Sequence, residues 1–226
     1  MLDGWWPGRR MVTAAGAAFA GFLLLVLLVV ATDGASTWLD GDLTPSLWAW
    51  ASQDAGRWSA MRVLTRGGEA IFRTLVIAPL VIVGLLRRRV AVATWAGLCG
   101  FSYGLVSSAA KAIIGRPRPV GADPELTFQE SSFPSGHSGG AMVVAIIVAC
   151  AVGMSLRGVA RVAVIVLSSA LPVVVGFTRM ALGVHYLSDV LAGFALAFAW
   201  AMLLAVVVRQ AAGRLCGAAP PVVRKE

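Results

Sequence analysis

The sequence contains little of what a soluble or disulfide-stabilised protein requires. Charged residues make up 13% of the 226 residues, whereas hydrophobic residues make up 58%, and the mean hydropathy is +0.82. A soluble domain could not bury so many apolar side chains. The three cysteines, Cys99, Cys150 and Cys216, are scattered and form no C-x-x-C pair, so we expect neither a disulfide framework nor a cysteine metal site. These shortages indicate a membrane protein.

The sequence patterns favour neither a cleavable leader nor an internal repeat. The first apolar run, at about residues 11–32, is longer than a signal-peptide core, and no A-x-A-like site with a polar region follows it. We therefore interpret this run as a retained span. No segment recurs at a fixed period, which argues against a solenoid and against an inverted-repeat transporter.

The apolar residues fall into runs that predict an all-α protein, a polytopic membrane bundle of six transmembrane helices in one domain over residues 1–226. The predicted spans cover about residues 11–31, 70–86, 90–110, 134–154, 162–177 and 186–208. Between the first two spans, residues 33–69 are polar and rich in tryptophan, which predicts a partly helical segment in the membrane interface. This segment is interpreted either as an aromatic belt or as a lip that admits a lipid substrate.

Basic residues mark the ends of the apolar runs. The net charge of +8 would indicate nucleic acid in a soluble protein, but these positions are typical of topology signals, so we expect no nucleic-acid partner. In a six-span bundle, most of these basic residues fall on the same side of the membrane: Arg9, Arg10, Arg87, Arg88, Arg89, Arg157, Arg161 and the basic C-terminal tail. The positive-inside rule makes that side cytoplasmic. Both termini are therefore predicted in the cytoplasm, and residues 33–69, 111–137 and 178–185 are predicted at the extracytoplasmic face of the plasma membrane.

Histidine is scarce, and the predicted topology places both histidines, His137 and His185, at the extracytoplasmic surface. An ionisable residue near a membrane span is a functional-site hypothesis by default. Asp189 follows His185 by four residues, so on a helix the two side chains share a face. The carboxylate can then hold one imidazole nitrogen while the other points outward. His185 is therefore a candidate nucleophile or base.

Three cations, Lys111, Arg118 and Arg179, are predicted at the same surface. Converging cations suit a phosphoryl group, because arginine forms bidentate hydrogen bonds to it and lysine adds a compact charge. The sequence P-S-G-H at residues 134–137 adds a predicted helix start. There the amides of Ser135 and Gly136 can bind an anion at the positive end of the helix dipole.

These parts predict a phosphoryl transfer that needs neither a metal ion nor another cofactor. His185, oriented by Asp189, would attack phosphorus in line and form a phosphohistidine, while His137 protonates the leaving oxygen. The cations and the helix-start amides would stabilise the equatorial oxygens in the transition state. Water activated by His137 would then release phosphate.

Three motifs in this region are similar to the signature of the type-2 phosphatidic acid phosphatase (lipid phosphate phosphatase) superfamily, which includes vanadium haloperoxidases. They are K-x6-R-P at residues 111–119, P-S-G-H at 134–137 and S/T-R-x5-H-x3-D at 178–189. The resemblance covers about residues 91–205. It implies phosphate binding by Lys111, Arg118, Ser135, Gly136 and Arg179, and catalysis by His137 as general acid, His185 as nucleophile and Asp189 as its partner.

The predicted function is hydrolysis of a lipid phosphate or diphosphate at the outer leaflet, with a polyprenyl diphosphate as the first choice of substrate. A phosphatidylglycerophosphate or phosphatidic acid phosphatase and a lipid phosphotransferase are alternatives. A lipid or anion transporter is the alternative of another class, although transport would favour ionisable groups spread through the bilayer depth. The lipid tail and the oligomeric state stay open. Two further arginines lie outside the proposed phosphate-binding set. Arg73 is expected to extend its side chain to the membrane interface, and Arg116 is interpreted either as a surface or head-group charge or as a substrate contact.

Overall fold

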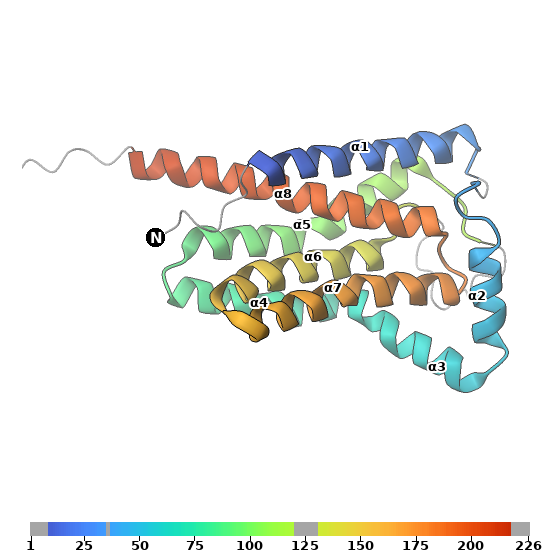
Figure 1. The fold of residues 1–226 in the computed structure, drawn as a ribbon. Coiled ribbons are helices and arrows are strands. Elements are labelled where there is room, and N and C mark those ends of the chain that lie inside the picture. Colours follow the sequence, from blue (N-terminus) through green and yellow to red (C-terminus); the bar gives the residue numbers. More distant parts are fainter. Residues whose placement is uncertain (1–8, 35–36, 120–130, 218–226) are drawn as a thin grey trace, which may run out of the picture.

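The computed structural model describes residues 9–34, 37–119 and 131–217, and the regular elements in these ranges are all helical (Figure 1). The long helices are α1 (Arg9–Ala31), α4 (Ala70–Leu86), α5 (Val90–Ile114), α6 (Gly136–Ala151), α7 (Gly158–Ala181) and α8 (Leu187–Gly217). The shorter ones are α2 (Leu43–Ser52), α3 (Ala55–Leu64) and the 3-10 turns η1 (Thr65–Gly68) and η3 (Gly153–Ser155). The all-α prediction is confirmed for the described part of the chain.

Each predicted span contains one long helix, but these helices differ in their capacity to cross a membrane. Among the described residues, α1, α5, α7 and α8 are long and apolar enough. A fifth candidate is the pair made by residues 55–68 and α4, which is bent by 43° at the break between its parts. Helix α6, with 16 residues, is shorter. Length and composition thus support four to five spans, and six spans stay a prediction.

Two helix ends lie away from their expected positions. Helix α5 was predicted to stop at Lys111 but runs one turn further, to Gly115, whose φ of 64° suits glycine and ends the helix. Helix α8 begins at Leu187, so His185 belongs to the connection before it and not to the helix. His185 nevertheless contacts Asp189 in the first turn of α8, as predicted, with Nδ1 of the histidine 3.4 Å from Oδ2 of the aspartate.

The centre of the bundle is formed by α5, α6 and α8, which pack on one another. The Trp95 indole of α5 is fully buried and donates a hydrogen bond to the Ala201 carbonyl of α8, at 2.8 Å. The outer faces are apolar as well: Leu24, Phe101 and Leu167 are 65%, 77% and 72% exposed. Exposed apolar surface on this scale marks contact with a membrane or a partner, which agrees with the prediction of a membrane protein.

Helix α6 approaches α5 and α8 closely because glycines lie at both contacts. A Cβ on Gly193 of α8 would lie 2.5 Å from the Ser135 carbonyl oxygen, and a Cβ on Gly139 would overlap the Tyr103 hydroxyl of α5. Neither position has room for a side chain. The Tyr103 hydroxyl donates to the Gly193 carbonyl at 3.2 Å, which joins α5 to α8 across the start of α6.

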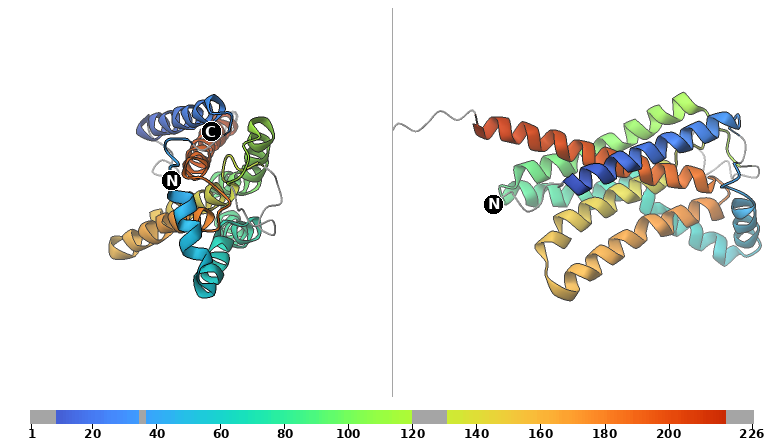
Figure 2. Two further views of the ribbon diagram at one scale, coloured as in Figure 1. Left: turned by 90° about the vertical axis from the view of Figure 1, so that its right-hand side faces the viewer. Right: turned by 45° about the horizontal axis from the view of Figure 1, so that its top comes forward.

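Helix α2 lies across one end of the bundle, and α3 leads from it toward α4 (Figure 1, Figure 2). Both short helices pack on α7. Their buried Ala51 and Met61 form a small apolar cluster with Leu182 and Val184 of the α7–α8 connection. The ends of α5 and α7 and the starts of α6 and α8 meet at this end, whereas the α4–α5 turn lies at the opposite end (Figure 1).

Candidate active site

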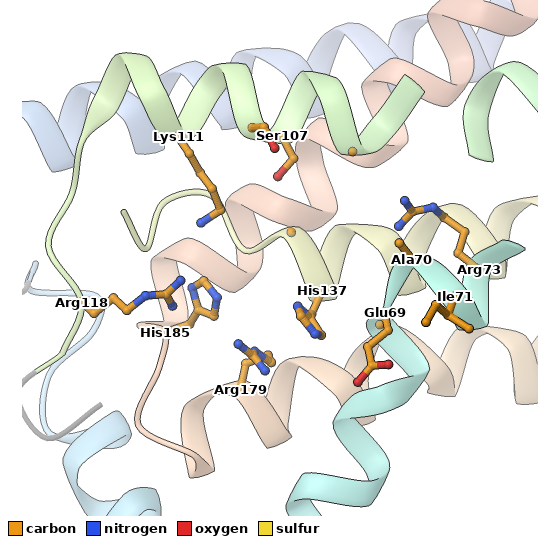
Figure 3. A pocket seen from close by; sticks show the side chains of 14 residues that line it. Glu69, Ala70, Ile71, Arg73, Ser107, Lys111, Arg118, His137, Arg179 and His185 are labelled. Atoms are coloured by element: carbon orange, nitrogen blue, oxygen red, sulfur yellow. The ribbon is translucent and has the colours of Figure 1, made fainter. Parts of the chain in front are cut away.

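A cavity of about 470 Å³ lies at the α2 end of the bundle (Figure 3). Its wall is formed by the start of α4, one face of α5, the start of α6, the end of α7 and the connections that precede α6 and α8. The predicted site residues on this wall are Lys111, Arg118, Gly136, His137, Arg179 and His185. Both histidines of the chain and the three predicted phosphate-binding cations therefore face one space, although they come from distant parts of the sequence.

His185 lies in the α7–α8 connection and is 2% exposed. Its Nδ1 lies 3.4 Å from Asp189 Oδ2, at the long end of the hydrogen-bond range, and this leaves Nε2 for the cavity. The His185 carbonyl accepts a hydrogen bond from Thr44 Oγ1 of α2, at 3.1 Å. Burial lowers the pKa of His185 well below 6.5, and the cations of the cavity, first Arg179, lower it further. The imidazole is therefore neutral at neutral pH, as a nucleophile requires.

Asp189 is held by Arg116, whose role the sequence leaves open between a surface or head-group charge and a substrate contact. Arg116 Nη1 lies 2.6 Å from Asp189 Oδ1, and Nη2 lies 2.8 Å from Asp40 Oδ2, with all three side chains fully buried. The same guanidinium donates to Ser188 Oγ at 2.7 Å. Arg116 is therefore neither a surface charge nor part of the cavity wall. It fixes the carboxylate that faces His185.

Asp40 connects the segment before α2 to the start of α8. Its carboxylate accepts hydrogen bonds from the Thr37 amide (2.9 Å), the Thr37 hydroxyl (2.8 Å) and the Ser188 amide (2.8 Å). Burial alone would raise the pKa of Asp40, but these bonds and that from Arg116 hold the pKa below its ordinary value of 3.8. Asp40 is thus ionised at neutral pH and shares the charge of Arg116 with Asp189.

Two of the predicted phosphate-binding cations are fixed by main-chain carbonyls. Lys111 Nζ donates to the carbonyls of Ser131 and Ser132, at 2.7 and 3.1 Å. Arg118 Nη1 donates to the Val184 carbonyl at 2.8 Å, and burial lowers the pKa of Arg118. These carbonyls orient the two cations at the cavity wall, where both can attract an anion.

The third cation, Arg179, is 2% exposed at the end of α7. Its Nη1 donates to Thr65 Oγ1 of η1 at 3.2 Å, and its Nε is buried with no hydrogen-bond partner among the described residues. A buried donor of this kind is costly unless a ligand satisfies it. Among the described residues of the cavity wall, one is acidic (Glu69) and four are basic (Arg73, Lys111, Arg118 and Arg179). The described wall therefore carries more positive than negative charge.

The start of α6 presents His137 to the cavity. Ser135 is the N-cap: its Oγ accepts from the Ser138 amide at 3.4 Å and lies 2.8 Å from Ser138 Oγ. The Ser135 amide donates to the Asp189 carbonyl at 2.9 Å. In the structure Ser135 is thus buried in the turn, whereas Gly136 and His137 lie on the cavity wall. The first amides of a helix lack intrahelical acceptors and favour an anion.

The sequence model of the PAP2 superfamily matches residues 90–212, more than half of the chain. The chain belongs to the PAP2 superfamily. The PAP2 match includes the three predicted motifs, and the resemblance inferred from them is confirmed.

A solved structure has the same fold. It is described as the crystal structure of the first transmembrane PAP2 type phosphatidylglycerolphosphate phosphatase from Bacillus subtilis. The two chains share 23% sequence identity with a TM-score of 0.68, over 89% of this chain and 96% of the other. A search of curated protein sequences found no match.

The residues outside the PAP2 match contribute to the site without any motif of their own. Thr44 and Thr65 bond to His185 and Arg179, as described above, and Arg73 of α4 lines the cavity. Arg73 was expected to snorkel, but it is 9% exposed and its Nε donates to the Gly100 carbonyl at 2.9 Å. The available signal was an arginine inside an apolar run, which is costly unless it serves a site.

Proposed function

We propose that this PAP2 protein is an integral-membrane lipid phosphatase that hydrolyses a lipid phosphate or diphosphate at the extracytoplasmic face through a phosphohistidine. The observation that carries the proposal is the shared cavity, in which a buried neutral His185 faces the same space as His137 and the cations Lys111, Arg118 and Arg179. Membership of the PAP2 superfamily and the apolar outer faces support it.

In the first step, His185 Nε2 attacks phosphorus and forms a P–N bond. His137 enters this step as the imidazolium. The bond from phosphorus to the leaving oxygen breaks, and that oxygen keeps the electron pair of the bond and takes the proton of His137, which becomes neutral and can act as the base in the second step. The His185 imidazole becomes positively charged, and the Asp189 carboxylate facing Nδ1 stabilises this charge.

In the second step, water loses a proton to His137 and attacks phosphorus. The P–N bond then breaks, which returns neutral His185 and releases inorganic phosphate. Through both steps the cavity cations and the first amides of α6 would stabilise charge on the equatorial oxygens. The residues present supply this charge without a metal ion, and independence of metal is part of the proposal.

A lipid substrate is favoured because the cavity reaches the outer apolar surface on its α4–α5 side. Ile71 lines the cavity and is 70% exposed, and Leu105, which follows the lining residue Gly104, is 62% exposed. A lipid could place its phosphate in the cavity while its chain lies along these helices. Helices α2 and α3 contribute no residue to the described cavity wall and pack on α7, which disfavours the interpretation of this segment as a lip for the lipid.

The proposed orientation follows from the basic connections. The α4–α5 turn, with Arg87, Arg88 and Arg89, lies at the end opposite the site (Figure 1). By the positive-inside rule this end would be cytoplasmic, with both termini, and the site would be extracytoplasmic. A polyprenyl diphosphate is the first choice of substrate, because an outward-facing site suits the recycling of such a carrier.

Phosphatidylglycerophosphate is the second candidate substrate. The related Bacillus subtilis protein is described as acting on it. The Glu69 carboxylate on the cavity wall gives a specific reason, because it could accept a hydrogen bond from the glycerol hydroxyl of that head group. Phosphatidic acid has neither that hydroxyl nor a second phosphate in its leaving group.

The test is release of inorganic phosphate by the purified protein in detergent from these three lipids. We expect His185→Ala to abolish release and His137→Ala to reduce it by roughly 10²- to 10⁴-fold. Arg66→Gln, which removes an exposed cation of η1 outside the cavity, is the matched control and should keep full activity. Full turnover in both histidine variants would refute the mechanism, and binding without phosphate release would favour a transporter.

Two further measurements separate the remaining alternatives. Addition of a chelator should leave the rate unchanged; loss of activity that only magnesium restores would contradict the proposed role of the cations. Addition of a lipid alcohol as acceptor distinguishes a phosphotransferase, since transfer would move the phosphoryl group to that lipid and not to water.

A further inference from the structure

The cavity extends well beyond the three phosphate-binding cations. Its α5 side is lined by Gly104, Ser107, Ser108 and Lys111, which lie on one face of that helix. Seven residues separate Gly104 from Lys111, a rise of about 10 Å along the helix axis. One phosphoryl group held by Lys111 would leave the Gly104 end of this wall uncovered.

Arg73 lies at the Gly104 end. Its Nε is fixed by the Gly100 carbonyl at 2.9 Å, and its Nη groups lie where α5 and α6 have no side chains: a Cβ on Gly104 would be 3.5 Å from Nη2, and one on Gly140 only 2.8 Å from Nη1. Figure 3 shows Arg73 on the opposite side of His137 from His185. A buried cation is thus held at the far end of the cavity, in a notch that glycines keep open.

Two other features of this end suit an anion. Ser107 is buried and lines the cavity, and its Oγ lies beside the Tyr103 hydroxyl without a hydrogen bond of standard geometry among the described residues. Ala70 and Ile71, the first residues of α4, line it as well, and the first amides of a helix lack intrahelical acceptors. Glu69 also lies at this end, but Figure 3 shows its carboxylate turned away from Arg73.

The direction of the reaction explains why an anion would lie there. In-line attack places the nucleophile and the leaving oxygen on opposite sides of phosphorus. With His185 as the nucleophile and His137 as the acid for the leaving oxygen, the leaving group extends past His137 toward Arg73.

We propose that Arg73, Ser107 and the first turn of α4 form a second anion subsite, which binds the non-reacting phosphate of a substrate that carries two. This inference rests on the proposed phosphatase function and narrows its substrate class. Lipids whose leaving group contains a phosphate, either directly bonded as in a diphosphate or spaced by a glycerol, are preferred over a lipid monophosphate such as phosphatidic acid. Arg73 binds the leaving group and does not act on the scissile phosphorus.

The first experiment compares Arg73→Gln with the wild-type protein on three lipids, a polyprenyl diphosphate, phosphatidylglycerophosphate and phosphatidic acid. We expect kcat/KM to fall roughly 10- to 100-fold on at least one of the two-phosphate lipids, because a charge-assisted hydrogen bond is lost. The rate on phosphatidic acid should change less than about twofold. The lipid on which kcat/KM falls most shows whether the subsite suits two directly bonded phosphates or two phosphates separated by a glycerol. Arg66→Gln is the control for loss of one nearby positive charge.

Equal losses on all three lipids would mean that Arg73 only braces α4 against α5 through the Gly100 carbonyl, and would overturn the subsite. Unchanged rates on the two-phosphate lipids would overturn it as well. Failure of the wild-type protein to release phosphate from any lipid is a different result, which refutes the proposed function itself.

A binding measurement tests the subsite without turnover. Orthophosphate, methylenediphosphonate and 1,3-propanediphosphonate are each added to the protein in detergent, and the unfolding temperature is recorded, since a ligand of the folded state raises it. We expect at least one diphosphonate to stabilise the wild-type protein more than orthophosphate does. Arg73→Gln should lose this excess and keep the orthophosphate shift, which also shows that the variant is folded. An excess that survives in Arg73→Gln would contradict the subsite.

Discussion

Arg116 and Asp189 form a fully buried ion pair, with Nη1 of the arginine 2.6 Å from Oδ1 of the aspartate. The other edge of the guanidinium contacts Asp40 Oδ2 at 2.8 Å, so one cation neutralises two carboxylates. Asp189 in turn faces His185 Nδ1. The orientation of the proposed nucleophile therefore depends on a residue that does not touch the substrate cavity, and on a segment that precedes the PAP2 match.

Replacement of this arginine is predicted to cost both stability and activity. Arg116→Gln would leave the buried Asp40 and Asp189 without a cation, and loss of one partner of a buried ion pair costs roughly 3–5 kcal/mol in the free energy of unfolding. Thermal unfolding in detergent measures this loss. Phosphate release should fall as well, because the Asp189 carboxylate is no longer held beside His185.

The matched control is Arg57→Gln. Arg57 and Asp54 form a pair at 3.7 Å whose side chains are 35% and 52% exposed. Such surface pairs contribute about 0–1 kcal/mol, so the unfolding temperature should hardly change. In Arg116→Gln, replacement of Asp40 by asparagine should recover part of the lost stability, because one uncompensated charge is removed. A normal unfolding temperature in Arg116→Gln alone would contradict the buried network.

The sequence allowed the helices to be predicted because their apolar runs are long. It also allowed the cavity residues to be chosen, since the two histidines and the basic residues of the motifs are scarce in an apolar chain. Topology alone brings the ends of α5 and α7 and the starts of α6 and α8 to one end of a bundle. That is why Lys111 and His185, 74 positions apart by their numbers, were expected together.

The roles of Arg116, Asp40 and Arg73 could not be read in the same way. Whether an arginine in a loop meets solvent, substrate or a buried carboxylate depends on the path of a distant segment, here the one before α2. Nothing in the residues around Asp40 specifies that its carboxylate reaches Arg116 and the Ser188 amide. The snorkelling expected of Arg73 failed for a similar reason, since the Gly104 and Gly140 notch is formed by two other helices.

Gly193→Ala is predicted to lower the catalytic rate more strongly than the stability of the fold. The added Cβ would lie 2.5 Å from the Ser135 carbonyl oxygen and 3.3 Å from the Gly139 amide, so α8 and the start of α6 must separate. Overpacking of this kind costs roughly 1–3 kcal/mol, but a shift of about 1 Å between His137 and His185 can lower the rate about 100-fold. Measurement of kcat alongside the unfolding temperature separates the two effects.

Gly97→Ala in α5 is the control for this substitution. There the added Cβ would meet only Val81 Cγ2, at 3.8 Å, which is ordinary contact, and alanine favours a helix more than glycine does. Its activity and unfolding temperature should equal or exceed those of the wild-type protein. Equal behaviour of the two alanine variants would show that the close approach at Gly193 is not needed.

The buried His185 is predicted to make the fold sensitive to mild acid. Burial, aided by the positive charges of the cavity, lowers the pKa of His185 well below 6.5, whereas in the unfolded chain it is about 6.5. Below pH 6.5 the unfolded chain therefore binds a proton that the folded protein excludes, and the free energy of unfolding falls by up to roughly 1.4 kcal/mol per pH unit for this group. Asp40, whose pKa lies below 3.8, adds nothing in that range. The drop in unfolding temperature between pH 7.5 and pH 5.5 should thus be smaller in His185→Gln than in the wild-type protein, and equal drops would show that His185 takes up its proton in the folded state.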